Sequence, residues 1–313
     1  MSVYLRLSIE DACNLRCTYC RPEHEVRLSE PAPVLAAGEL EVLARAIDAV
    51  EPVYKLRLTG GEPLLRPDAV ELTARLREAL PDAELCLTTN GTLLAPLARP
   101  LAGAGLARIN VSLDSADAKR YAALTRGGDL GATLAGIEAA RSAGLERIKL
   151  NTVLLEHGNG DALADLLRLA ARLDCEIRFI ELMPIGVAAG LHREEFLSCD
   201  RAFERLASRF EPLGPLPPSS TARRSAFDVE GRRVEVGFIS SVSAPFCDRC
   251  DRLRLDCRGR LYACLRRWDG LDLAGPMRAG GRDALPERIR RVLAAKCPPE
   301  SDWPGRQMSA IGG

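Results

Sequence analysis

Six of the eleven cysteines in this 313-residue chain fall into two groups whose spacing could hold a metal cofactor. The first group, Cys13, Cys17 and Cys20, forms a C-x3-C-x2-C motif. Three thiolates can hold a [4Fe–4S] cluster that leaves one iron without a protein ligand, because such clusters normally use four cysteines. That iron would be an open coordination site of the kind found in catalytic metal centres. The alternative is a structural zinc site completed by His24.

The second group is C-x2-C-x13-C and consists of Cys247, Cys250 and Cys264. Two cations in its spacer, Arg252 and Arg254, share one face if that segment is extended. A second open-sited cluster beside two cations would suit a substrate bound at one end by iron and neutralised along its length. The alternative is a zinc ribbon completed by Cys257. We expect the other cysteines to be small apolar side chains or free thiols, namely Cys86, Cys175, Cys199 and Cys297.

The composition indicates the class of protein that carries the two cysteine groups. Hydrophobic residues make up 47% and charged residues 27%, as in a globular protein. The 43 Lys and Arg balance 43 Asp and Glu, which argues against a uniformly basic surface for nucleic acid or a membrane. The first twenty residues include Arg6, Glu10 and Arg16 and lack a signal-peptide pattern, so we expect a cytoplasmic protein. Clustered cysteines there point to metal rather than to disulfides.

Short alternating runs followed by helical periodicity predict an α/β protein. The predicted strands are 3–9, 54–59, 84–88, 108–113, 147–153 and 176–181, and the predicted helices are 38–50, 67–80, 94–104, 130–143 and 161–173. Six strand–helix repeats indicate a parallel sheet in a partial (β/α)6 barrel. We assign this barrel to residues 1–190 and a second-cluster, substrate-binding region to residues 191–313.

In the second region we predict a loop at 212–220, a hairpin of 223–229 with 233–240, and a helix over 285–296.

Each predicted barrel strand has one aliphatic and one polar face. Because the helices outside the sheet need the aliphatic faces, the polar faces should point inward. They carry the cations Arg6, Lys55, Arg57 and Lys149, with Arg178 on the sixth strand, beside Thr59 and Asn151. Buried cations are costly unless neutralised, so they predict a polyanionic small molecule such as a polyphosphate. The alternative is structural ion pairs with Asp114, Glu181 or Glu62.

The first cysteine motif and a glycine pair together resemble a known superfamily. Tyr19 precedes the last cysteine, and Gly60-Gly61-Glu62-Pro63 follows the second strand, as in radical S-adenosylmethionine (SAM) enzymes. The resemblance implies that the open iron binds SAM, which is cleaved to a 5′-deoxyadenosyl radical. It further implies a set of cofactor-binding residues: Tyr19, Gly61 at the methionine amine, Thr88, Ser112 and Arg178 at the ribose and carboxylate, and Met183 near the adenine.

Longer matches are similar to one radical SAM family, the GTP 3′,8-cyclases of molybdenum cofactor biosynthesis. They run from one end of the chain to the other: YLRLSIEDACNLRCTYC at 4–20, KLRLTGGEPLLR at 55–66, INVSLDS at 109–115, RFIELMPIG at 178–186, FISSVSAPFCDRCDRLRLDCRGRLYACL at 238–265, and the ending MSAIGG.

This resemblance implies two [4Fe–4S] clusters, SAM as cofactor and GTP as substrate. The second cluster would bind the guanine, and the inward cations with Arg252 and Arg254 would neutralise the triphosphate. The radical would remove the ribose 3′ hydrogen, and the resulting carbon radical would attack C8. The family also uses its last two glycines, here Gly312 and Gly313, which without the resemblance would be taken for a frayed end. We therefore count Arg6, Arg252, Arg254, Gly312 and Gly313 as catalytic candidates.

The resemblance implies partners as well: an external electron donor and, by pathway, a cyclic pyranopterin monophosphate synthase downstream. It allows a homodimer. Three positions depart from the usual family residues, namely Asp251, Arg21 and Ala12, and the segment 212–236 matches the family poorly. The rival interpretations are a two-cluster radical SAM enzyme acting on a peptide or RNA, and a zinc-stabilised scaffold without enzymatic activity.

Overall fold

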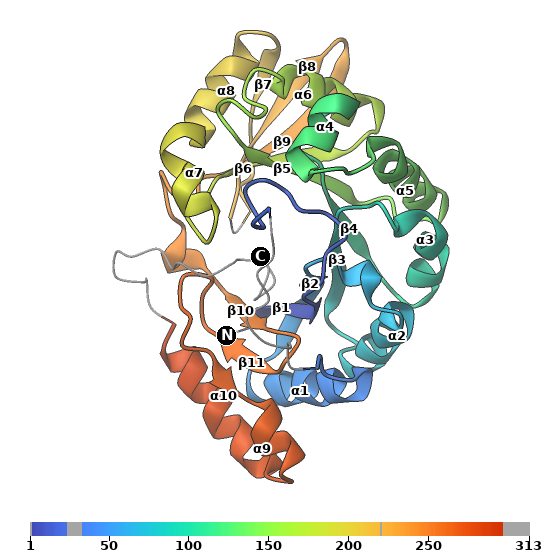
Figure 1. Ribbon diagram of the computed structural model, residues 1–313, viewed down its shortest axis with the longest axis vertical. Helices are drawn as coiled ribbons and strands as arrows, with labels where there is room; N and C mark the ends of the chain where they lie inside the picture. Colours follow the sequence, from blue (N-terminus) through green and yellow to red (C-terminus); the bar gives the residue numbers. More distant parts are fainter. Residues whose placement is uncertain (1, 24–32, 220, 297–313) are drawn as a thin grey trace.

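Strands and helices alternate along the chain; the strands form the inner layer of the molecule, and the helices cover the outer side of the sheet (Figure 1). The computed structural model describes residues 2–23, 33–219 and 221–296. The barrel strands are β1 (Val3–Glu10), β2 (Val53–Gly60), β3 (Glu84–Thr89), β4 (Arg108–Ser112), β5 (Ile148–Leu154) and β6 (Glu176–Glu181). The helices between them are α1 (Ala37–Val50), α2 (Ala69–Ala79), α3 (Leu94–Gly103), α4 (Ala118–Thr125), α5 (Leu130–Ser142) and α6 (Leu163–Arg172). The predicted α/β partial barrel is therefore confirmed.

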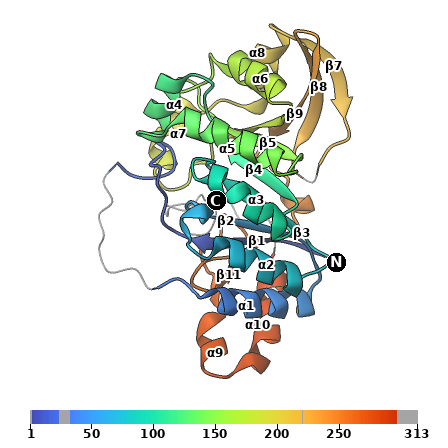
Figure 2. The same ribbon diagram turned by 90° about the vertical axis from the view of Figure 1, so that its right-hand side faces the viewer.

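The C-terminal region extends the same sheet on both sides. Its elements are α7 (Ala188–Glu195), α8 (Cys199–Ala207), β7 (Glu211–Leu216), β8 (Arg223–Val229), β9 (Arg232–Ile239), β10 (Arg252–Leu255), β11 (Arg260–Tyr262), β12 (Leu271–Asp272), α9 (Ala274–Arg278) and α10 (Leu285–Ala294). Strands β1 to β6 lie in chain order, β10 pairs parallel with β1, and β9 pairs parallel with β6. Figure 2 shows β7–β9 at one end of the molecule and α9 and α10 at the other.

The hairpin prediction is confirmed, and part of the loop prediction is wrong. Strands β8 and β9 pair antiparallel through Glu230 and Gly231, which both have positive φ, as a tight hairpin turn requires. Residues 212–216, expected to be loop, belong to β7. Among the residues that the structure describes, β7 pairs only with β8 and lies at the edge of the sheet. Prolines are tolerated there because one side of an edge strand needs no hydrogen bonds.

One hydrophobic core supports both regions. The aliphatic faces of the barrel strands are buried beneath the helices, as with Leu5 and Leu7 of β1, which are fully covered. The same core cluster contains Leu253 of β10 and Ile289 of α10. Covering a Leu or Ile side chain stabilises a fold by about 1.5–3 kcal/mol, so the C-terminal region contributes to the stability of the barrel. Within the described residues, no helix has the length and hydropathy to cross a membrane.

Glu181, at the end of β6, fixes the start of the C-terminal region. Its buried carboxylate accepts hydrogen bonds from the backbone amides of Cys199 (3.0 Å), Val242 (2.9 Å) and Ser243 (2.8 Å), and from the Ser243 hydroxyl. The loop that carries Val242 and Ser243 leads directly to Cys247. One side chain therefore ties α8 and the second cysteine group to the barrel.

Replacing Glu181 with Ala should lower the free energy of unfolding by about 2–4 kcal/mol, because it leaves several buried donors without acceptors. Urea denaturation measures this loss. The exposed Glu204→Ala on α8 is the control and should change stability by less than about 0.5 kcal/mol. Equal small effects of both variants would contradict the anchoring role.

Candidate active site

A single cavity of 1290 Å³ collects both cysteine groups and the inner faces of the strands. All six predicted cluster cysteines line it: Cys13, Cys17, Cys20, Cys247, Cys250 and Cys264. So do most of the other predicted site residues: Arg6, Tyr19, Lys55, Arg57, Thr59, Gly61, Thr88, Ser112, Asn151, Arg178, Met183, Arg252 and Arg254. Lys149 is not among the lining residues. Gly312 and Gly313 lie outside the described residues, as do Cys297 and His24.

The first cysteine group sits on a loop after β1 that its own backbone shapes. The Cys20 amide donates to the Cys17 carbonyl at 2.9 Å, and the Leu15 amide donates to Cys13 Sγ at 3.4 Å. Burial raises the pKa of all three thiols, that of Cys20 to about 11. Iron–sulfur clusters are held by partly shielded thiolates, and amide hydrogen bonds such as the one to Cys13 Sγ stabilise them. Iron binding keeps such thiols deprotonated even where their pKa is raised. These residues fit three ligands of a [4Fe–4S] cluster.

The loop is clamped from the side by the end of α4. The amides of Arg16 and Thr18 donate to the carbonyls of Thr125 (3.1 Å) and Leu124 (2.9 Å). Arg126, just beyond α4, donates to the carbonyls of Arg16 at 3.3 Å and Arg21 at 3.0 Å. The positions of the cysteines therefore depend on a helix that we did not predict.

The glycine pair after β2 is required by close packing against the same loop. The Gly61 amide donates to the Glu10 carbonyl at 2.8 Å, and the Glu62 amide to the Ala12 carbonyl at 2.7 Å. A Cβ on Gly61 would lie 2.1 Å from the Ala12 oxygen, a distance no side chain can occupy. Glycine therefore lets β2 approach the residues that precede Cys13.

Two predicted cofactor-binding side chains have defined partners. The Tyr19 hydroxyl donates to the Asp114 carboxylate at 2.6 Å, and the Val153 amide donates to the other oxygen of Asp114 at 2.8 Å. Burial raises the pKa of Asp114 to about 6. Arg178 Nε donates to Glu176 at 2.6 Å. Tyr19 and Arg178 are thus held in place by carboxylates that lie outside the predicted site.

The second cysteine group is brought to the cavity by a short turn and by β11. The turn is η2 (Cys247–Arg249), in which the Cys250 amide donates to the Cys247 carbonyl at 3.1 Å. The Arg266 amide donates to Cys264 Sγ at 3.4 Å. Burial, with Cys264 and Cys250 nearby, raises the pKa of Cys247. This group therefore resembles the first: each has three thiols, and in each a backbone amide donates a hydrogen bond to one of the sulfurs.

Cys257 does not join this group. It is fully buried outside the cavity, its Sγ accepts a hydrogen bond from Arg258 at 3.6 Å, and Asp11 is a further neighbour. The ten described cysteines are all free, so no disulfide closes either group. Over the described ranges, no three His, Cys, Asp or Glu side chains are grouped as ligands of a single metal ion.

Three guanidinium groups lie in a row across neighbouring strands. Arg6 of β1 is in register with Arg57 of β2 and Arg254 of β10. Burial, together with the neighbouring arginines, lowers the pKa of Arg6 to about 10, although Tyr4 acts in the opposite direction. Burial and the arginines also lower the pKa of Arg254 well below its usual range. The row therefore lies on the wall of the cavity, on the strand faces that we predicted to point inward.

Tyr4, two residues before Arg6, contacts Arg57 of this row and two further cations of the cavity. Its hydroxyl accepts a hydrogen bond from Arg57 Nε, and its ring lies 5.5 Å from Lys55 Nζ and 5.7 Å from the Arg252 guanidinium carbon. Burial alone would raise the pKa of Tyr4, but Arg57, Arg6 and Arg252 lower it to about 8. The polar-face pattern of β1 contained Tyr4, yet we did not assign it to the site.

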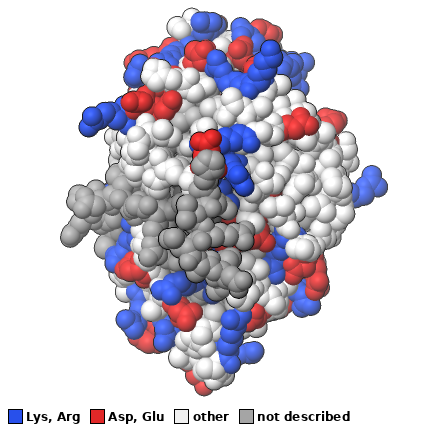
Figure 3. Space-filling view, viewed as in Figure 1, with Lys and Arg blue, Asp and Glu red and all other residues white. Residues whose placement is uncertain are grey.

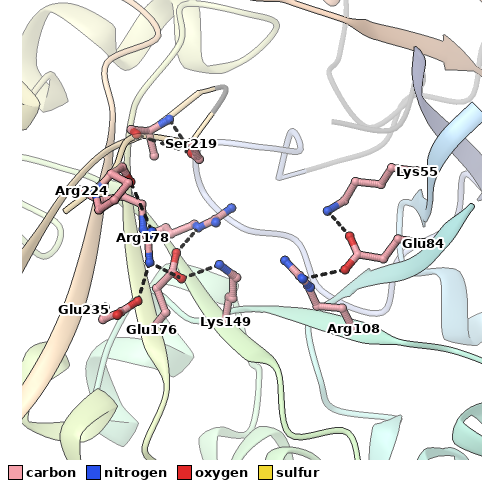
Figure 4. A network of polar contacts seen from close by, with 11 residues as sticks. Lys55, Glu84, Arg108, Lys149, Glu176, Arg178, Ser219, Arg224 and Glu235 are labelled. Atoms are coloured by element: carbon pink, nitrogen blue, oxygen red, sulfur yellow. Dashed lines mark hydrogen bonds and ion pairs between the residues drawn. The ribbon is translucent and has the colours of Figure 1, made fainter. Parts of the chain in front are cut away.

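The other inward cations are paired with two glutamates (Figure 4). Glu84 binds Lys55 at 2.6 Å and Arg108 at 2.6 Å, and Glu176 binds Lys149 and Arg178. The alternative of structural ion pairs thus holds for these residues but names the wrong carboxylates. Asp114, Glu181 and Glu62 bind backbone amides and hydroxyls instead; Glu62 accepts from Thr89 Oγ1 at 2.7 Å.

Further lining residues were missed for different reasons. Arg108 and Asn110 share the inward face with Ser112, so strand alternation could have identified them. Lys296 follows α10, and its Nζ donates to the Arg252 carbonyl at 2.8 Å, a tertiary contact without a local sequence signal. Asp251, which departs from the family pattern, accepts a hydrogen bond from the Tyr54 hydroxyl at 2.5 Å.

Charge on the outer surface is mixed where the described residues can be seen. On the face drawn in Figure 3, basic and acidic side chains are interspersed. Two arginines of the segment 212–236, which matches the family poorly, form ion pairs: Arg223 with Asp200 at 2.6 Å, and Arg224 with Glu235. The concentration of positive charge described above is internal.

Comparison with known proteins agrees with this geometry. Residues 7–170 match the radical SAM superfamily, and residues 175–301 match a family described as Molybdenum Cofactor Synthesis C. The chain is 44% identical to a GTP 3′,8-cyclase of Pseudomonas putida, over 93% of this chain and 86% of that protein. It is 42% identical to a GTP 3′,8-cyclase of Moorella thermoacetica, over 99% of this chain and 97% of that protein.

A solved structure shares the fold at low sequence identity. Streptococcus suis SuiB bound to S-adenosylmethionine superposes with a TM-score of 0.63 at 13% identity. The match covers 88% of this chain and 63% of SuiB, so the chain spans less than two thirds of that protein. Radical SAM enzymes carry a [4Fe–4S] cluster that binds SAM. The chain is a radical SAM enzyme and belongs to the GTP 3′,8-cyclase family.

Proposed function

We propose that this enzyme converts GTP to (8S)-3′,8-cyclo-7,8-dihydroguanosine 5′-triphosphate, the first step of molybdenum cofactor biosynthesis. It would use SAM and two [4Fe–4S] clusters, with electrons from an external donor. The observation that carries the proposal is the single cavity lined by both three-cysteine groups and by a row of buried cations. A pocket for one small ligand typically measures about 300–1000 Å³. The cavity of 1290 Å³ exceeds that range, which supports a site that holds more than one bound group.

The first cysteine group and the residues around it would hold the cofactor. Cys13, Cys17 and Cys20 would bind the first cluster, and Gly61, Thr88, Ser112, Arg178, Met183 and Tyr19 would bind SAM. When bound, the cluster and SAM supply a 5′-deoxyadenosyl radical. This chain's part would be to position SAM and the substrate inside the cavity and to limit the access of water to a reactive species. The Tyr19–Asp114 hydrogen bond supports that role because it fixes the loop next to Cys20.

The second cysteine group and the cations would hold GTP. Cys247, Cys250 and Cys264 would bind the second cluster and orient the guanine, while the triphosphate would lie against Arg6, Arg57, Arg252 and Arg254. Thr59, Lys55 and Asn151 complete the lining of the proposed substrate site. Lys149 is not itself a lining residue, but it lies two residues from Asn151 on the same face of β5, and we include it in the proposed site. A polyanion stabilises buried guanidinium groups that otherwise repel one another. Binding of the triphosphate would therefore be favoured beside these arginines. Gly312 and Gly313 remain predicted catalytic residues.

The proposed activity is tested by anaerobic incubation of reconstituted protein with GTP, SAM and a reductant. The expected products are the 3′,8-cyclised nucleotide and 5′-deoxyadenosine in equal amounts, measured by mass spectrometry. ATP in place of GTP is the control and should give no cyclised nucleotide. Formation of 5′-deoxyadenosine without a cyclised product from GTP would reject the substrate assignment.

Metal analysis tests the second cluster. The reconstituted protein should contain about eight irons per chain, since each cubane has four. Cys264→Ser should reduce this to about four by removing one ligand of the second cluster. Cys257→Ser is the matched control and should retain all the iron because Cys257 lies outside the cavity. Four irons with tightly held zinc in the unaltered protein would contradict the two-cluster proposal.

Replacing both Arg252 and Arg254 with Ala should weaken GTP binding about 100-fold, if each lost charge-assisted contact is worth about 1.4 kcal/mol. SAM binding should change less than about threefold, because these arginines belong to β10 and flank the second cysteine group. Isothermal titration calorimetry under anaerobic conditions measures both constants. Equal losses for the two ligands would indicate that the arginines support the fold instead.

A further inference from the structure

Glu176 is the one carboxylate in Figure 4 that joins residues with two different proposed roles. Its Oε1 accepts a hydrogen bond from Arg178 Nε at 2.6 Å, and its Oε2 binds Lys149 Nζ. Arg178 is a proposed ligand of SAM, whereas Lys149 is a proposed ligand of GTP. One oxygen of Glu176 thus contacts a proposed SAM-binding residue, and the other contacts a proposed GTP-binding residue.

The sheet explains why this side chain can reach both cations. Glu176 and Arg178 are two residues apart on β6 and so share the inward face. Lys149 of β5 lies directly opposite Glu176 in the register of the two strands. Main-chain pairing therefore fixes all three side chains on one surface, with exposed fractions of only 10%, 17% and 13% for Glu176, Arg178 and Lys149.

The charge balance shows what Glu176 does for its neighbours. Burial and the adjacent Arg178 lower the pKa of Lys149 to about 8, and Glu176 acts in the opposite direction. Burial would raise the pKa of Glu176, but Arg178 and Lys149 lower it, so the carboxylate is ionised. Without that charge, the pKa of Lys149 would fall further, and Arg178 would lose the acceptor of its Nε.

We propose that Glu176 is a positioning residue shared by the two ligand sites, holding Lys149 charged for the triphosphate and Arg178 oriented for the SAM carboxylate. The inference rests on the proposed function and deepens it. Arg224 adds a third cation at 3.7 Å from the same Oε2, and its closer partner is Glu235. Glu176 itself touches neither ligand in this proposal; it acts through the two cations.

Glu84 provides a matched control from the same barrel. It also bridges two cations, Lys55 and Arg108, at 2.6 Å each, and its own side chain is 30% exposed. Lys55 is a proposed GTP ligand, and neither partner of Glu84 is a proposed SAM ligand. Glu84→Gln therefore removes a similar charge from the substrate site alone.

The experiment measures dissociation constants for GTP and for SAM on anaerobically reconstituted protein, in Glu176→Gln, Glu84→Gln and the unaltered chain. Glu176→Gln should weaken both ligands by about tenfold, whereas Glu84→Gln should weaken GTP by about tenfold and SAM by less than about twofold. Circular dichroism and thermal unfolding establish the folded fraction. A residue that only stabilised the fold would lower the unfolding temperature without changing either dissociation constant of the folded protein.

Several outcomes would overturn the inference. These are tighter GTP binding by Glu176→Gln, a loss confined to one ligand, or equal losses of both ligands in Glu84→Gln. If Glu176→Gln does not fold, Glu176→Asp takes its place. Aspartate retains the charge but is one methylene too short to reach both cations. Unchanged binding of both ligands by Glu176→Asp would then overturn the inference. Failure of the unaltered protein to bind GTP would reject the proposed function together with the inference, whereas normal binding that Glu176→Gln leaves intact rejects the inference alone.

Discussion

Repulsion among buried guanidinium groups is the constraint on which the rest of this site depends. Arg57, Arg6 and Arg254 lie side by side on three adjacent parallel strands, and burial disfavours the charge on two of them. Such a row costs free energy in the folded protein, and the large aliphatic core beneath the helices must offset that cost. Proteins retain arrangements of this kind where a bound anion recovers the cost. In the function proposed above, binding of a polyanionic substrate would offset this repulsion.

The parallel sheet explains how this charge meets two separate cysteine groups. One group follows directly from β1, and the other lies on both sides of β10, which pairs with β1. The barrel places the arginines between them because side chains of equal register share one face. The glycine pair after β2 and the clamp from α4 then fix the first loop, and Glu181 fixes the approach to the second. Rigid secondary structure carries most of the positioning, and short loops carry the sulfur ligands.

Much of this arrangement could be predicted from sequence because it depends on local patterns. Strand alternation identified the inward face of Arg6, Arg57 and Ser112, and cysteine spacing identified both groups. What could not be predicted were contacts between distant elements. Glu84 and Glu176 became partners of the lysines through strand register, and Lys296 reached the cavity through the packing of α10. The prolines of β7 suggested a loop because the sequence does not show that this segment lies at the edge of the sheet. A strand with a neighbour on one side only can accommodate proline.

The pairing of β1 with β10 also has a consequence for biogenesis. Just beyond the two strands, Arg258 binds Asp11, a residue 247 positions earlier in the chain. On the ribosome, β1 would remain an unpaired edge until nearly the whole polypeptide has emerged, and unpaired edges recruit other strands. Nascent chains that stall before β10 should therefore be prone to aggregate and dependent on chaperones, even though their hydrophobic strands are already complete.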